Sequence, residues 1–111
     1  MMTEDKKLVV IFCRYEFSKK SPAKIEKHTK KLLNFKERLE KTFKDLAFVV
    51  TSSKDVAKRV YEKNVDRMFA VIAVEPRFFG LVVDEANCPC VSIKPERFTI
   101  DELTKEILKL Q

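Results

Sequence analysis

The chain has 111 residues and a net charge of +6, with 23 Lys and Arg residues against 17 Asp and Glu residues. Its single glycine excludes nucleotide sites built on glycine-rich loops, in which the backbone must approach a phosphate without an intervening Cβ atom. Apolar runs fall far short of the roughly 20 residues of a membrane-spanning helix, which predicts a cytoplasmic protein without membrane contact. The three cysteines of such a chain are expected to be reduced thiols.

The first half of the chain predicts two strands separated by a long helix. Residues 8–13 (LVVIFC) form a continuous apolar run, which is typical of a strand buried on both faces of a parallel sheet. Ser21 and Pro22 suit the N-cap and the first position of a helix that continues to about Phe43. The apolar face of this helix is formed by Ile25, His28, Leu32, Phe35 and Leu39. A second buried strand follows at residues 46–50.

A second helix and a third strand come next. Ser52 is the predicted N-cap of this helix, and Asp55, three residues later, completes a capping box. Asn64 is the predicted C-terminal stop, because asparagine tolerates the backbone geometry of helix ends. Residues 68–74 (MFAVIAV) form another apolar run and predict the third buried strand.

Segment 77–87 allows two interpretations. Pro76 favours a short helix, because proline is well suited to the first helical turn. Residues 78–83 can instead form a strand, because Gly80 and the valines that follow it are poor helix formers. Residues 90–93 predict the strand that follows.

The C-terminal helix has well-marked boundaries in the sequence. Thr99 is its predicted N-cap, and Glu102 is the partner of Thr99 in a capping box. Phe98 and Leu103 occupy the two positions of a hydrophobic staple, which fixes the direction in which the chain enters the helix.

The order of these elements predicts the fold class. Buried strands that alternate with helices are typical of a sheet covered on both faces. We therefore predict a single α/β domain over residues 1–111, a three-layer sandwich with a four-stranded, mainly parallel sheet. The alternative is a mixed five-stranded sheet, which applies if residues 78–83 form a strand.

Positive charge is concentrated in residues 1–45, which hold 13 Lys and Arg against seven Asp and Glu and so account for the whole excess. A basic helix face neutralises phosphates and releases their counterions, which predicts a non-catalytic module that binds nucleic acid or another polyanion. The predicted contact residues are Arg14, Lys19, Lys20, Lys24, Lys27, Lys30 and Lys31. An alternative is a protein-interaction or self-association module that uses the sheet edge or the first helix. The charged fraction of 36% is typical of heat-adapted proteins.

The carboxyl ends of the predicted strands suggest a second anion site. Ligands of parallel α/β sheets bind beyond these ends. Ser52 and Ser53 follow the second strand at a predicted helix N-terminus, where unpaired N–H groups favour anions. We therefore predict an anion-binding role for both serines, with simple helix capping as the alternative.

Cys13 raises the alternative of a phosphate-ester enzyme. Its position after the first strand resembles the Cys-loop of low-molecular-weight phosphatases, a resemblance that implies a nucleophilic thiolate. The chain departs from that loop because Lys19 stands where the family has Arg and because no glycine is present. A packed, structural cysteine is the favoured interpretation. His28, Cys88 and Cys90 offer too few spaced ligands for zinc, so neither a metal site nor a cofactor is predicted.

Overall fold

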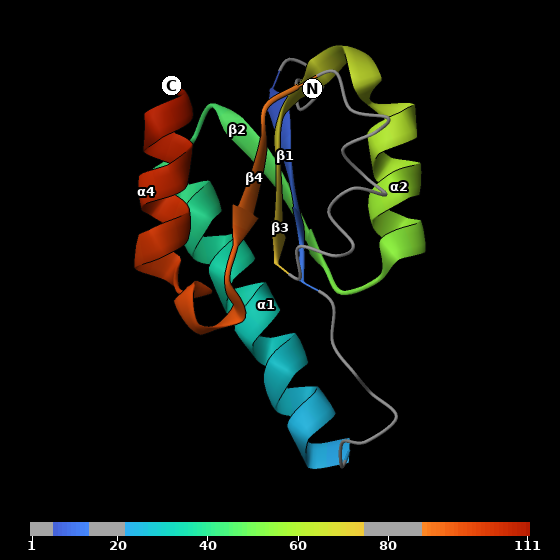
Figure 1. The fold of residues 1–111 in the computed structure, drawn as a ribbon, viewed down its shortest axis with the longest axis vertical. Helices are drawn as coiled ribbons and strands as arrows, with labels where there is room; N and C mark the ends of the chain where they lie inside the picture. The colour runs from blue at the N-terminus through green and yellow to red at the C-terminus, as the bar shows by residue number, and fades with distance from the viewer. Residues whose placement is uncertain (1–5, 14–21, 75–87) are drawn as a thin grey trace.

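The computed structural model describes residues 6–13, 22–74 and 88–111 (Figure 1). The strands of this part are β1 (Lys7–Phe12), β2 (Leu46–Thr51), β3 (Met68–Val74) and β4 (Cys90–Ile93). The helices are α1 (Pro22–Thr42), α2 (Lys54–Lys63) and α4 (Ile100–Leu110), with short 3₁₀ turns η3 (Val65–Arg67) and η4 (Pro95–Arg97).

The described strands form one all-parallel sheet in the order β2-β1-β3-β4, which confirms the predicted four-stranded α/β fold. β1 is an inner strand, and its residues after Lys7 are all buried, as its continuous apolar run predicts. β3 and β4 have the predicted bounds, whereas β2 extends one residue further, to Thr51. β1 begins and ends one residue earlier than the predicted 8–13, because its ladder with β2 runs from Lys7 to Phe12. The segment at 77–87, and with it the alternative strand at 78–83, lies outside the described residues.

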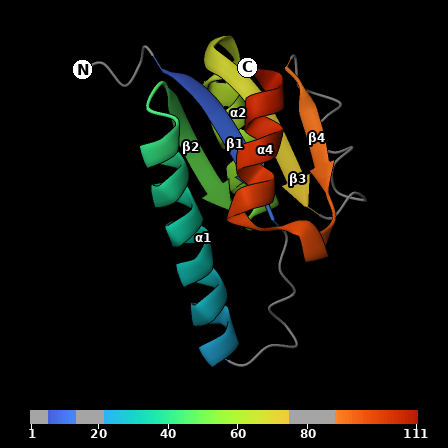
Figure 2. The ribbon, with the colours of Figure 1, turned by 90° about the vertical axis from the view of Figure 1, so that its left-hand side faces the viewer.

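Two helices cover one face of the sheet and α2 covers the other (Figure 2). The larger core lies under α1 and α4 and includes Leu39, Leu103 and Ile107, which have no exposed surface. The smaller core lies between the opposite face of the sheet and α2, where Ala57 is fully buried beside Val10 and Phe12. The sheet is therefore the middle layer of the predicted sandwich.

The N-cap of α2 is Ser53, so the prediction of Ser52 at this position was wrong. The Ser53 hydroxyl oxygen accepts a hydrogen bond of 3.2 Å from the Val56 backbone N–H, and its backbone is extended. The reason is the additional residue in β2, because the Thr51 hydroxyl accepts a 3.0 Å hydrogen bond from the Ser53 N–H and delays the helix start. The predicted cap of α4 is confirmed, since the Thr99 hydroxyl accepts from the Glu102 N–H at 3.2 Å.

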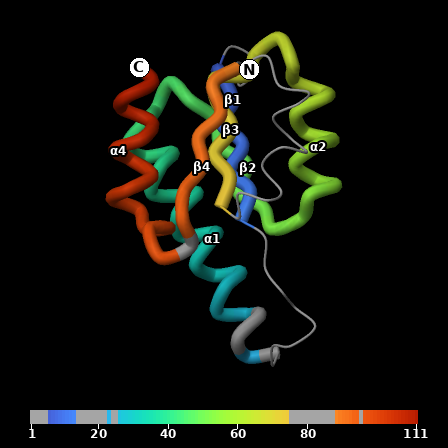
Figure 3. The backbone as a smooth tube through the Cα atoms, in the orientation of Figure 1, coloured from blue at the N-terminus to red at the C-terminus, as the bar shows by residue number. Residues whose placement is uncertain are grey.

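Helix α1 is longer than the strands that it covers. Its 21 residues span about 31 Å, whereas a strand of six residues spans about 20 Å. The N-terminal part of α1 consequently extends beyond the carboxyl edge of the sheet, and α4 begins near that edge (Figures 2 and 3). Among the described residues, no helix combines the length and the apolar character required to cross a membrane.

Candidate anion-binding surface

The charged side chains of α1 are separated into two flanks on either side of its buried stripe. Successive residues of a helix are rotated by about 100°, so positions can be assigned to flanks from their spacing. One flank, here called the cationic flank, has exposed basic side chains and, from residue 27 to residue 42, no acid. Its basic residues are Lys27, Lys31 and Arg38.

The opposite flank of α1 contains the acids of this helix, and lysines there form ion pairs. Lys36 Nζ lies 3.0 Å from Glu40 Oε2, and Lys30 Nζ lies 3.6 Å from Glu26 Oε1. Both pairs have the spacing of four residues that brings side chains together on a helix surface. The local positive field of this flank is therefore partly neutralised, whereas no ion pair between described residues involves the cationic flank.

Lys31 shows which way the cationic flank faces. Its Nζ lies 5.5 Å from the ring centroid of Phe35 and 5.4 Å from that of Phe98. The two rings are themselves packed at 5.1 Å with an interplanar angle of 60°. Because Phe98 lies between η4 and α4, the cationic flank is directed toward residues 94–97, in which the exposed Lys94 and Arg97 stand on either side of the exposed Glu96. This part of the surface thus gains cations from the far end of the sequence.

The predicted polyanion residues are distributed as follows. Lys27 and Lys31 lie together on the cationic flank, whereas Lys30 is turned toward Glu26. Lys24 lies in the first turn of α1. The remaining predicted residues, Arg14, Lys19 and Lys20, lie outside the described residues.

Arg38, Lys94 and Arg97 are cations of this surface that are not among the predicted contact residues. Arg38 belongs to the basic first helix, and helical spacing places it on the same flank as Lys27 and Lys31. Arg97 could have been suspected because it precedes the predicted staple residue Phe98. That Arg97 lies near α1 is evident only from the tertiary structure, in which Lys31 contacts the ring of Phe98, the next residue in the chain.

Ser52 and Ser53 lie away from the cationic flank. They precede α2, which lies on the opposite face of the sheet from α1, so they are not part of the surface formed by the cationic flank. The Ser53 hydroxyl is engaged as the helix cap, and Ser52 is half-buried. The alternative interpretation, simple helix capping, is therefore the one that the structure shows for Ser53.

Cys13 lies in the larger core with 7% of its surface exposed, as expected of a packed cysteine at a strand end. Its backbone N–H donates a 2.9 Å hydrogen bond to the Thr51 carbonyl, which fixes the end of β1 beside β2. A nucleophilic thiolate needs an electropositive and partly open setting. The burial of Cys13 therefore gives no support to the phosphate-ester alternative.

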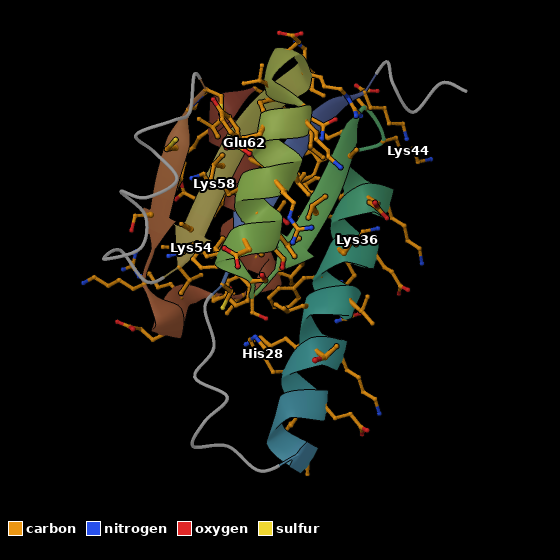
Figure 4. All side chains as sticks on the ribbon, turned by 90° about the vertical axis from the view of Figure 1, so that its right-hand side faces the viewer. His28, Lys36, Lys44, Lys54, Lys58 and Glu62 are labelled. Atoms are coloured by element: carbon orange, nitrogen blue, oxygen red, sulfur yellow. The ribbon has the colours of Figure 1, made fainter. Side chains whose placement is uncertain are left out.

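His28 is half-buried on α1 and points toward the carboxyl edge of the sheet, as Figure 4 shows from the α2 side. Burial, followed by the positive charge of Lys31, lowers the pKa of His28 below its ordinary value. The imidazole is consequently neutral at pH 7 and does not add to the positive charge of the cationic flank.

The cysteines that flank Pro89 are free thiols. Burial and then the neighbouring Cys90 raise the pKa of Cys88 to about 11. Burial also raises the pKa of Cys90, whose Sγ donates a 3.4 Å hydrogen bond to the Cys88 carbonyl. Both thiols are therefore protonated at neutral pH. Within the described ranges, no group of three or more His, Cys, Asp or Glu side chains is arranged to hold a metal ion.

Comparisons with protein-family models, with curated proteins and with solved structures find no match to this chain.

Proposed function

We propose that this protein is a non-catalytic binding module that contacts nucleic acid or another polyanion in the cytoplasm. The observation that supports this proposal is the segregation of charge on α1. Lys27, Lys31 and Arg38 share one exposed flank, while the acids of the helix are on the other. An unneutralised row of cations favours an extended anion, because each phosphate that it contacts releases a condensed counterion.

The geometry of the flank suits a regular polyanion. Lys27 and Arg38 are separated by about 17 Å along the helix axis, given a rise of 1.5 Å per residue. A nucleic-acid duplex has one charge for about every 1.7 Å of its axis, so several phosphates lie within that length. Lys94 and Arg97 extend the positive surface beyond the helix at the edge where Lys31 meets Phe98.

A binding assay with a matched control tests the proposal. The probe is a fluorescently labelled 20-base-pair duplex of mixed sequence, titrated at low salt and followed by anisotropy. The triple variant Lys27→Gln, Lys31→Gln, Arg38→Gln removes three charges from the cationic flank and keeps good helix formers. We expect it to bind at least about tenfold more weakly than the unchanged protein.

The control removes three charges from other helices. Arg59→Gln, Lys63→Gln and Lys105→Gln change exposed residues of α2 and α4 and alter the net charge by the same amount. This variant should bind only about twofold more weakly than the unchanged protein, because only the general effect of its lower net charge remains. Equal weakening in both triple variants, or no binding by the unchanged protein at low salt, would overturn the proposal.

A further inference from the structure

Among the described strands, β4 is an edge strand of the sheet, and its neighbour is β3 (Figure 2). The Val71 N–H donates a 3.0 Å hydrogen bond to the Pro89 carbonyl, and Val71 is aligned with Cys90 in the register. Main-chain groups of alternate residues point to the same side of a strand, so those of Cys90 and Ser92 point away from β3. The described part of β4 therefore presents main-chain donors and acceptors at the edge that faces away from β3, where the described residues place no other strand.

A cavity of about 240 Å³ lies where β4 meets α4. Its lining residues are Ser92, Ile93, Lys94, Arg97, Glu102 and Glu106. The cations come from the carboxyl end of β4 and from η4, whereas the carboxylates come from α4. Glu106 is the more enclosed partner of its pair with Lys109, with 19% of its side chain exposed and a separation of 3.4 Å.

We propose that this edge binds an extended peptide that ends in a free carboxylate. The peptide adds to β4 as a parallel strand and pairs with the main chain of Ser92, a recognition mode that other proteins use at sheet edges. Because the peptide runs in the direction of β4, its terminal carboxylate lies beside Lys94 and Arg97. A basic side chain two residues upstream then points toward Glu102 and Glu106.

The charges and the length of the strand favour a peptide over a second copy of the chain. The cavity is lined by two cations and by two carboxylates, which match a terminal carboxylate and an upstream ammonium group. β4 has four residues and is flanked by Pro89 and Pro95. Two such strands would pair over a short length, whereas stable interfaces bury roughly 1,200 Å² or more. A short peptide, in contrast, requires only the four residues of β4 for its main-chain pairing.

The test uses an N-terminally labelled tetrapeptide of sequence Thr-Lys-Val-Val with a free carboxylate, followed by fluorescence anisotropy. We expect saturable binding that weakens at least about tenfold when the same peptide ends in an amide. Arg97→Gln should produce a similar loss. Lys105→Gln, an exposed change on α4 outside the cavity, should have no effect. Equal binding of the acid and the amide would overturn the proposal.

Main-chain pairing is tested separately with Ser92→Pro. Proline removes the outward N–H of Ser92 and leaves the bonds of β4 to β3 in place, so the variant should fold and lose binding. The peptide with an N-methyl group on the amide that pairs with Ser92 gives the same test on the unchanged protein. Undiminished binding of the methylated peptide would overturn the pairing. A concentration-dependent dimer that Ser92→Pro abolishes would overturn the peptide as occupant in favour of a second copy.

Discussion

The ammonium group of Lys31 lies 5.4 Å from the ring centroid of Phe98, although 67 positions separate the two residues in the sequence. Phe98 is buried, whereas Lys31 remains exposed, so the lysine covers the outer side of a core ring. This contact joins α1 to the entrance of α4. It also orients the cationic flank toward η4, which is the arrangement on which the proposed polyanion surface depends.

The contact between Lys31 and Phe98 should be measurable as a coupling energy. Lys31→Met keeps the aliphatic stem and removes the charge, and Phe98→Leu keeps an apolar side chain and removes the ring. Urea unfolding of both single variants and the double variant should give a coupling of about 0.5–1 kcal/mol. Strict additivity of the two changes would show that the ring and the cation do not interact.

The position of the α2 cap gives a second prediction. Ser53→Ala removes the hydroxyl that accepts from the Val56 N–H, so it should lower the free energy of unfolding by about 1 kcal/mol. Ser52→Ala is the matched control and should change stability by less than about 0.5 kcal/mol, because Ser52 is not the cap. A larger loss for Ser52→Ala, measured by urea unfolding, would contradict the cap seen in the structure.

The lowered pKa of His28 predicts a dependence of stability on pH. The unfolded chain binds the imidazole proton near pH 6.5, whereas the folded chain binds it only at lower pH. The unfolded state therefore holds more protons within this window, and stability is lost as the pH falls from about 6.5 through the lower folded pKa. Urea unfolding between pH 5 and 7.5 should show this loss, and His28→Gln should remove that part of it. An identical pH dependence in the variant would contradict the prediction.

The thiol of Cys88 should react slowly with alkylating agents. Its pKa of about 11, compared with an ordinary 9.0, makes the thiolate about 100-fold rarer at pH 7.5. Labelling with iodoacetamide, followed by peptide mass spectrometry, should show a rate that still rises above pH 9.5. The urea-unfolded chain serves as the control, and its labelling rate should reach half of its maximum at the pH of an ordinary thiol pKa. A labelling rate in the folded protein that reaches half of its maximum at or below pH 9 would contradict this prediction.

Much of the fold could be predicted because the sheet is buried on both faces. Continuous apolar runs in β1 and β3 leave little ambiguity about strand position, and β3 and β4 have the predicted bounds. The cap of α4 was predictable because Thr99 acts through a bond to a residue three positions away. The cap of α2 was not, because the extra residue of β2 belongs to the ladder with β1, in which Thr51 pairs with Phe12.

The candidate surface could be predicted only in part. The basic character of α1 is a local property, and Lys27 and Lys31 were identified from it. The direction of the cationic flank depends on where Phe98 packs, and the sequence alone does not show that Phe98 meets Phe35. The cavity at β4 was missed for a similar reason, since Arg97 and Glu106 become neighbours only when α4 packs beside β4.

The salt dependence of duplex binding tests the central claim most directly. The logarithm of the association constant is measured against the logarithm of salt concentration for the unchanged protein, the triple variant at Lys27, Lys31 and Arg38, and the matched control. If each of these three residues neutralises a phosphate, the magnitude of the slope should fall by about 2.7 in the first variant and remain unchanged in the control. An unchanged slope in the variant of the cationic flank would show that α1 does not contact the phosphates.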